Sequence, residues 1–140
     1  MKPRENAQVS LEYLLLAAVL LSTMAFLMPS ITAFYNASVF AIETKKASAF
    51  LQNLASKAEK INLFEEASTE SIQAFPNSTE WKLSAENNKL VLEVESKGLE
   101  KTKTLSQETR ASFESFEQAF SKSLEIRLKK QGGKILIINS

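Results

Sequence analysis

The chain has 140 residues, of which 17 are Lys or Arg and 16 are acidic, and it contains neither cysteine nor histidine. Every acidic residue is glutamate. This composition excludes disulfides, Cys/His metal sites and Cys–His or Ser–His–Asp catalysis, and the small net charge gives no electrostatic support for nucleic-acid binding. With three glycines and no phosphate-binding glycine loop, we expect a protein that is not an enzyme and holds no cofactor or metal.

The first predicted element is an uncharged segment of thirty residues, from Tyr13 to Ile42. As a helix it would extend about 45 Å, enough to cross the ~30 Å hydrocarbon core of a bilayer. Lys2 and Arg4 precede it, so the positive-inside rule places the N-terminus in the cytoplasm and the rest of the chain outside. Two ordinary explanations compete. A secretory signal peptide would have a shorter apolar region of ~7–15 residues, whereas a plain single-pass anchor would let Glu12 reach the headgroups from the membrane edge.

A short ordered motif stands at the start of this segment, where Ala7 to Leu15 read AQVSLEYLL. It resembles the class III signal motif of archaeal type IV pilin-like proteins. The resemblance implies that a membrane prepilin peptidase cuts between Ala7 and Gln8 on the cytoplasmic side and removes residues 1–7 as a leader. Three residues occupy the positions of the family's processing motif: Gln8, Ser10 and Glu12.

In that family the mature subunit keeps its apolar helix and assembles through it. The resemblance implies that the carboxylate of Glu12 meets the new α-amine of Gln8 on a neighbouring copy. Two charges that are each unfavourable in an apolar setting neutralise each other only at the correct stagger, so the pair would set the register of assembly. The implied partners are copies of the chain or other pilins, the prepilin peptidase, the membrane, and the assembly platform with its ATPase.

The helical pattern continues beyond the apolar segment. Pro29 lies inside it and predicts a kink, because proline removes an i→i−4 hydrogen bond. We expect a helix to about Glu66, with residues 8–42 as a hydrophobic transmembrane or filament-core part and residues 43–66 as an amphipathic continuation on a globular head. The apolar positions that recur at helical spacing in the second part are Ala47, Phe50, Leu51, Leu54, Ala58 and Ile61.

Residues 67–140 change to the two-residue period of strands and predict a β-rich globular head. The clearest unit is TEWKLSAENNKLVLEVES, where we predict a hairpin with a two-residue turn at Asn87-Asn88. This register pairs Leu83 with Leu92 and sets Lys82 opposite Glu93, so both faces agree.

A second hairpin is predicted around Gly132-Gly133, between residues 124–128 and 135–138. The four consecutive apolar residues 135–138 predict burial on both faces of their strand, between the helix and a neighbouring subunit. Residues 71–75 would add an edge strand that ends before Pro76, and residues 99–105 another strand.

Residues 106–122 leave helix, strand and loop open. Phe113, Phe116 and Phe120 lie at helical spacing with Leu124, and Ser106 would cap such a helix, whereas related pilin heads usually have strand or loop there. In either conformation we expect this aromatic row to belong to the core and not to an exposed adhesive patch.

Two triplets fit the Asn-x-Ser/Thr sequon for N-glycosylation, one at Asn36 and one at Asn77. Asn77 follows Pro76 in a predicted surface turn and is the candidate glycan acceptor. Asn36 is the weaker candidate, because it would lie on the long helix, where assembly would bury it.

These patterns predict an α+β fold, with a long N-terminal helix packed on a small antiparallel β-sheet head. The resemblance implies a major or minor pilin. Its precursor would sit in the cell membrane with a cytoplasmic N-terminus and an extracellular head, and its mature form would build a surface filament for adhesion or surface attachment. The alternative is a membrane-tethered, single-pass extracellular binding or accessory module that does not polymerise.

Overall fold

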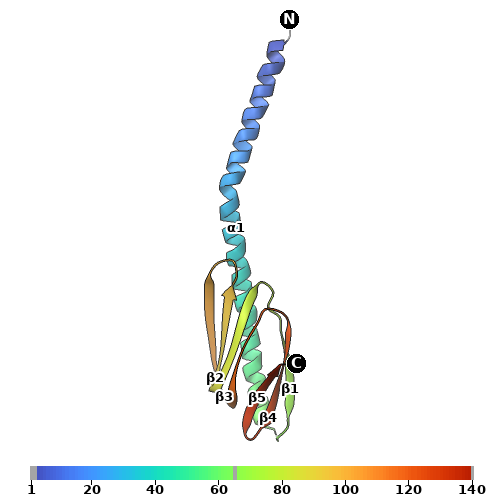
Figure 1. Ribbon diagram of the computed structural model, residues 1–140, viewed down its shortest axis with the longest axis vertical. Coiled ribbons are helices and arrows are strands. Elements are labelled where there is room, and N and C mark those ends of the chain that lie inside the picture. Colours follow the sequence, from blue (N-terminus) through green and yellow to red (C-terminus); the bar gives the residue numbers. More distant parts are fainter. Residues whose placement is uncertain (1–2, 65, 140) are drawn as a thin grey trace. The chain divides into compact units, whose positions relative to one another are not determined.

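The computed structural model describes residues 3–64 and 66–139, and the side chains of residues 3–9 lie outside this description (Figure 1). One helix is followed by five strands, in the order α1 (Pro3–Asn62), β1 (Thr69–Ala74), β2 (Thr79–Ser96), β3 (Lys101–Phe120), β4 (Leu124–Gln131) and β5 (Lys134–Asn139). The chain divides into two compact units at Ala37/Ser38, and α1 contributes to both.

The first unit is helical throughout its described part. Pro29 lies inside α1 and the helix continues on both sides of it, so the proline does not end the helix, and a kink there stays a prediction. Three hydroxyl side chains donate to carbonyl oxygens of the preceding turn: Ser22 to Ala18, Thr23 to Val19 and Leu20, and Thr32 to Met28. These bonds let polar side chains lie within an apolar helix without an unsatisfied hydroxyl.

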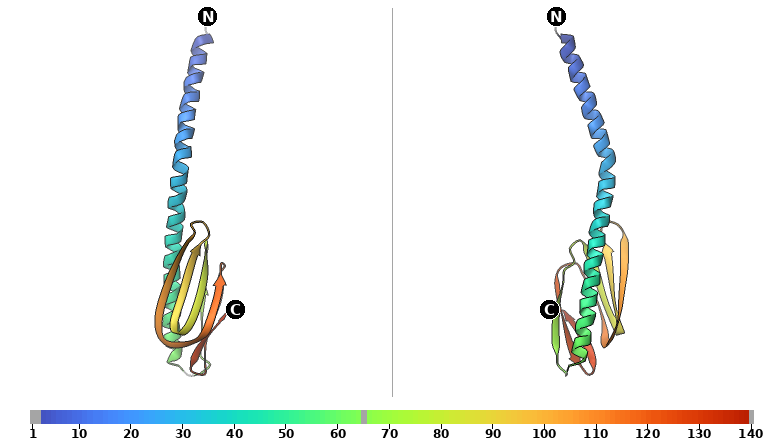
Figure 2. Two further views of the ribbon diagram at one scale, coloured as in Figure 1. Left: turned by 60° about the vertical axis from the view of Figure 1, so that its left-hand side comes forward. Right: turned by 180° about the vertical axis from the view of Figure 1, so that it is seen from behind.

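The second unit is an α+β head. In it, residues 38–62 of α1 lie along one face of the sheet (Figure 2). All six apolar helix positions predicted from the sequence are buried: Ala47, Phe50, Leu51, Leu54, Ala58 and Ile61. The predicted helix–sheet packing is therefore confirmed. The helix ends at Asn62, four residues before the predicted end, and Glu66 already belongs to the link that leads to β1.

The five strands form one sheet in the order β1-β4-β5-β3-β2. Pairing is antiparallel for β1 with β4, β4 with β5, and β2 with β3, whereas β3 and β5 run parallel where Phe113 lies beside Ile135. The predicted α+β layout is thus confirmed. The sheet is mixed and not wholly antiparallel as predicted, because the β4–β5 hairpin brings β5 back alongside β3 in the parallel direction.

The predicted turn at Asn87-Asn88 is wrong. β2 continues through both residues and pairs along its length with β3, so that Leu92 faces Leu105 and the turn falls at residues 97–100. The apolar positions before and after Asn87 are out of phase with each other, and the strand corrects this with a register shift at Asn87, whose φ is 52°. A positive φ at asparagine serves a bulge as well as a turn.

Because the predicted register is wrong, the predicted ion-pair partner of Lys82 is wrong as well. Lys82 Nζ lies 2.6 Å from Glu117 Oε1 on β3, whereas the predicted partner Glu93 faces Thr104. The carboxylate of Glu117 raises the pKa of Lys82 above its ordinary value. The sequence therefore predicts correctly that Lys82 forms a cross-strand ion pair, but it assigns the partner to the wrong strand.

The second hairpin is confirmed. β4 and β5 pair from Ile126 with Asn139 to Gln131 with Lys134, and the two turn glycines both have positive φ, 61° at Gly132 and 75° at Gly133. Glu66 holds this turn, since its carboxylate accepts both glycine N–H groups at 3.0 Å. Residue alternation in β5 leaves Ile138 exposed in the single chain. Burial of the second face of this strand, which a neighbouring subunit would complete, stays a prediction.

The remaining strand predictions are largely confirmed. β1 is an edge strand that ends before Pro76, and residues 101–105 begin β3. Residues 106–120, which the sequence left open, are strand. The aromatic row is core as expected: Phe113 and Phe120 are buried, while Phe116 and Leu124 pack against the core at its margin.

Candidate functional site

The first unit presents a long and largely apolar surface. Every described side chain from Ser10 to Tyr35 is exposed, and the large apolar ones include Leu14, Leu16, Val19, Leu20, Leu21, Met24, Phe26, Leu27, Met28, Ile31 and Phe34. Within the described residues there is one helix long and apolar enough to cross a membrane. An apolar surface of this extent requires lipid or other protein as a partner, and it is consistent with membrane anchoring.

The residues of the processing motif lie at the beginning of α1. Ser10 and Glu12 are exposed, while Ala7 and Gln8 lie in the helix with side chains outside the description. Glu12 makes no hydrogen bond or ion pair with any side chain that the structure describes, so its carboxylate is available to a partner from another molecule.

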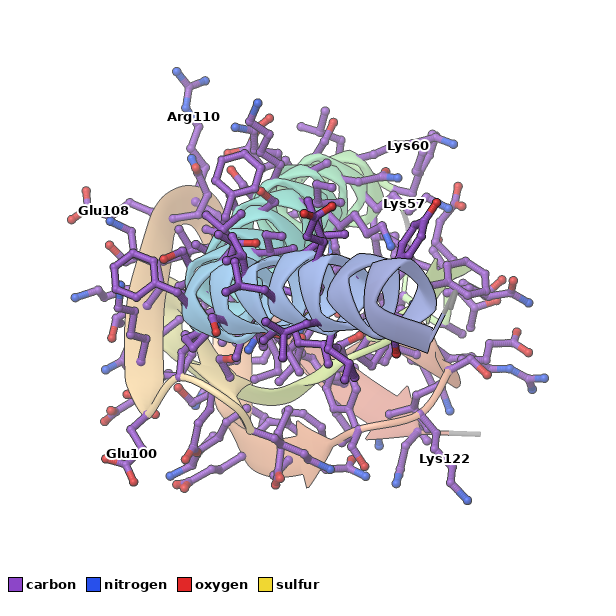
Figure 3. The ribbon with its side chains drawn as sticks, turned by 90° about the horizontal axis from the view of Figure 1, so that it is seen from above. Lys57, Lys60, Glu100, Glu108, Arg110 and Lys122 are labelled. Atoms are coloured by element: carbon purple, nitrogen blue, oxygen red, sulfur yellow. The ribbon has the colours of Figure 1, made fainter. Side chains whose placement is uncertain are left out.

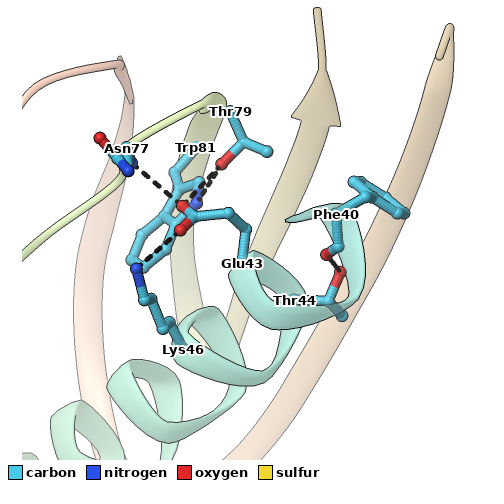
Figure 4. Close-up of polar contacts among 7 residues, drawn as sticks. All are labelled: Phe40, Glu43, Thr44, Lys46, Asn77, Thr79 and Trp81. Carbon is cyan, nitrogen blue, oxygen red and sulfur yellow. Dashed lines mark hydrogen bonds and ion pairs between the residues drawn. The ribbon is translucent and has the colours of Figure 1, made fainter. Parts of the chain in front are cut away.

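The second unit contains a buried carboxylate that sequence analysis missed. Glu43 is 2% exposed, and three groups donate to it: Lys46 Nζ at 2.8 Å, the backbone N–H of Asn77 at 3.0 Å and the hydroxyl of Thr79 at 3.3 Å (Figure 4). Burial alone would raise the pKa of Glu43. The donors outweigh it, and the pKa lies below its ordinary value of 4.5.

The network continues into the aromatic core. Trp81 Nε1 donates to Thr79 Oγ1 at 2.9 Å, and the Trp81 ring lies with its centroid 5.7 Å from that of Phe50 and 6.1 Å from that of Phe120. Glu43 thus links α1 to the start of β2 through polar bonds, directly beside the aromatic contacts. The sequence did contain a signal for the burial of Glu43, because Glu43 lies four residues before Ala47 and therefore on the buried face of α1.

A buried carboxylate with three donors is suited to holding elements together. Its two oxygens already accept from three donors and are almost closed to solvent, which leaves little room for a substrate. Among the described residues no buried side-chain nitrogen or oxygen lacks a partner. We therefore assign Glu43 a structural role: it fixes residues 77–81 on the helix.

The stability of the head should fall in acid through this group. Because the folded pKa of Glu43 is lowered, its contribution is present above pH 4.5 and is lost as the pH falls through the folded value. Urea unfolding of the full chain in detergent, followed by Trp81 fluorescence between pH 3 and 7, should show a midpoint that drops below pH 4.5. The drop should be smaller in Glu43→Gln, and an equal drop in both proteins would contradict this assignment.

A second charged group covers the edge strand β1. Glu70 accepts from Lys60 Nζ at 2.6 Å and lies 3.5 Å from Lys57 Nζ, while Lys57 also donates to the carbonyl oxygen of Ser71. Lys60 first and Lys57 second keep the pKa of Glu70 below its ordinary value. Figure 3 shows Lys57 and Lys60 on the outside of the head. Charged side chains along an edge discourage unwanted strand pairing.

The two sequons have different surroundings. Asn77 is exposed in the link between β1 and β2, while Asn36 is half-buried and lies on α1. Glycosylation of either residue stays a prediction.

Comparison of the chain with protein-family models, with curated proteins and with solved structures finds no match. The structure defines the class as an α+β head preceded by an apolar helix with an exposed surface. The function is therefore argued from the residues of these two units.

Proposed function

We propose that this chain is a structural subunit, a major or minor pilin, of an archaeal type IV pilus-like surface filament. The observation that carries the proposal is the exposed apolar helix of the first unit, which begins with the ordered motif Gln8, Ser10 and Glu12. The membrane would hold the precursor, with its N-terminus in the cytoplasm and its head outside, and filament assembly would follow processing.

The organisation of the head supports this role. All the buried apolar residues of the core cluster belong to the second unit, from Ala47 to Ile137. The head thus completes its core without residues 10–37, the apolar part of α1. The surface of this part stays available to lipid before assembly and to other copies afterwards. Moving the apolar part of α1 from lipid into contact with other copies carries no large hydrophobic penalty, so specific polar contacts can decide whether the chain assembles.

Glu12 is the group whose free energy should differ most between the bilayer and the filament. A carboxylate costs up to about 3 kcal/mol at the centre of a bilayer and less near its edge. Hydrolysis of the Ala7–Gln8 peptide bond by water leaves a carboxylate on Ala7 and an amine on Gln8. In a filament, the amine of one copy would neutralise Glu12 of the next, which favours assembly over dispersal in the membrane.

N-terminal mass spectrometry of the membrane fraction and of sheared surface material tests the proposal. We expect Gln8 as the first residue in both fractions, and abundant chain in the sheared material if it is a major pilin. A chain that begins at Met1 and stays in the membrane would favour the tethered, unpolymerised module. A cut on the far side of the apolar segment, near Ser30, would indicate an ordinary secretory signal.

A further inference from the structure

The link between β1 and β2 presents an acceptor for covalent modification. Asn77 is exposed there, and its side-chain amide makes no hydrogen bond with the residues that the structure describes. Its backbone N–H, by contrast, is fixed by Glu43 at 3.0 Å. A held backbone beneath a solvent-accessible amide suits a residue that carries a large group without disturbing the fold.

An uncovered aromatic ring lies two residues before this amide. Phe75 is 58% exposed and borders an apolar hollow together with Phe50, Ile72 and Trp81. Exposed apolar surface next to polar residues is typical of a ligand site. The C–H faces of a sugar ring pack well on an aromatic ring, so a sugar attached to Asn77 would cover surface that the protein itself leaves open.

We propose that Asn77 is N-glycosylated and that the first sugar of the glycan packs on Phe75. The sequon is completed by Thr79. This proposal rests on the part of the proposed function that places the head outside the membrane, where lipid-linked glycans are transferred.

The chemistry requires a glycan donor activated as an ester of a lipid phosphate. A bond forms between Nδ2 of Asn77 and the anomeric carbon of the first sugar, and the bond between that carbon and the phosphate oxygen breaks. The lipid phosphate leaves with the electron pair, and the transferase takes up the amide proton. No oxidant, reductant or metal from this chain takes part.

The structure also indicates which comes first, modification or folding. A transferase must read the hydroxyl of the sequon's third residue, but Thr79 is 2% exposed in the folded head. That hydroxyl already donates to Glu43 and accepts from Trp81. Glycan transfer at Asn77 must therefore precede the docking of residues 77–81 on α1.

The first experiment is peptide mass spectrometry of the full chain from its own cells. We expect a glycan mass on the peptide that contains Asn77, its loss in Asn77→Gln, and none on the peptide that contains Asn36, whose sequon is helical. A bare Asn77 would overturn the proposal. The same digest reports the N-terminal residue, so a chain that begins at Gln8 with a bare Asn77 refutes the glycan and leaves the proposed function standing.

The second experiment tests the order of events. Membranes that hold the transferase and its lipid-linked donor are given either the folded, unmodified full chain in detergent or a synthetic peptide of residues 73–83. We expect the folded chain to be modified at least tenfold more slowly than the peptide. Equal rates would overturn the inferred order.

The third experiment tests the contact with Phe75. Asn77→Gln keeps the backbone N–H that binds Glu43, so it removes the glycan and leaves that anchor. We expect it to lower the Tm of the full chain by about 2–5 °C, which is the shift that the loss of one modest contact gives in a domain of this size. In a Phe75→Ala background the same change should lower the Tm by clearly less. Equal shifts in both backgrounds would overturn the sugar–ring contact.

Discussion

Replacing Glu12 with valine should reduce the amount of chain in sheared filaments at least tenfold while leaving membrane insertion and cleavage at Ala7–Gln8 intact. Valine makes the helix more apolar, so insertion is not impaired. What is lost is the partner for the α-amine of Gln8 on the adjacent copy, and that amine would then lie unpaired among apolar side chains. A tenfold change in incorporation corresponds to about 1.4 kcal/mol, which a single desolvated charge pair can readily supply.

Quantitative immunoblots of sheared and membrane fractions measure this effect. Leu16→Val is the matched control, because it changes an exposed apolar residue of the same helix and removes no charge; it should give a normal filament yield. Glu12→Gln should behave like Glu12→Val, since an amide cannot neutralise the amine.

Two results would count against the role of Glu12. One is a normal filament yield from Glu12→Val. The other is a filament whose Gln8 has cyclised to pyroglutamate, because such a terminus has no basic amine to pair with the carboxylate.

Local sequence patterns predicted those parts of the fold whose signals are local. The buried face of α1 follows from apolar spacing alone, and all six predicted positions lie in the core. The β4–β5 turn follows from Gly132-Gly133, whose positive φ angles other residues adopt only with strain. In both cases the information lies within a few residues of the element that it determines.

The β2–β3 pairing could not be predicted in this way. Two asparagines between alternating apolar runs fit a tight turn and a bulge equally well, and the choice depends on a partner strand that lies further along the chain. β3 supplies that partner: it pairs with β2 on both sides of the irregularity at Asn87. Its bulged part is held by Asn88, whose side chain donates to the carbonyl oxygens of Thr109 and Ala111.

Glu43 was missed for a related reason. As the first charge after the apolar segment, it reads as the point where the helix enters water. Its donors Asn77 and Thr79 lie 34 and 36 residues further along the chain, and only the tertiary fold brings them to it. The motif residues Gln8, Ser10 and Glu12 are the opposite case, because a motif is read directly from the sequence and its partner belongs to another molecule.

Replacing Glu43 with alanine should destabilise the head by about 3 kcal/mol. Lys46 loses little, because its side chain is about half exposed and its ammonium can be solvated by water. The buried hydroxyl of Thr79 and the part-buried N–H of Asn77 lose a common acceptor, which costs about 1–3 kcal/mol for each group left unsatisfied. For a head of roughly 100 residues, this corresponds to a Tm lowered by about 12 °C or more, which thermal unfolding of the full chain in detergent would detect through Trp81 fluorescence.

A double-mutant cycle separates the network from general damage to the helix. Thr79→Val keeps the shape of the side chain and removes its hydroxyl, so it breaks the same bond from the other side. Because the two changes remove one shared interaction, Glu43→Ala with Thr79→Val should cost clearly less than the sum of the single changes. Glu59→Ala is the control on the exposed face of α1, where the carboxylate accepts from the N–H of Arg110 and from no other described residue, and it should cost less than about 1 kcal/mol. Additive costs for Glu43 and Thr79, or a Glu43→Ala protein as stable as the Glu59→Ala protein, would show that the helix is held to the sheet by its apolar face alone.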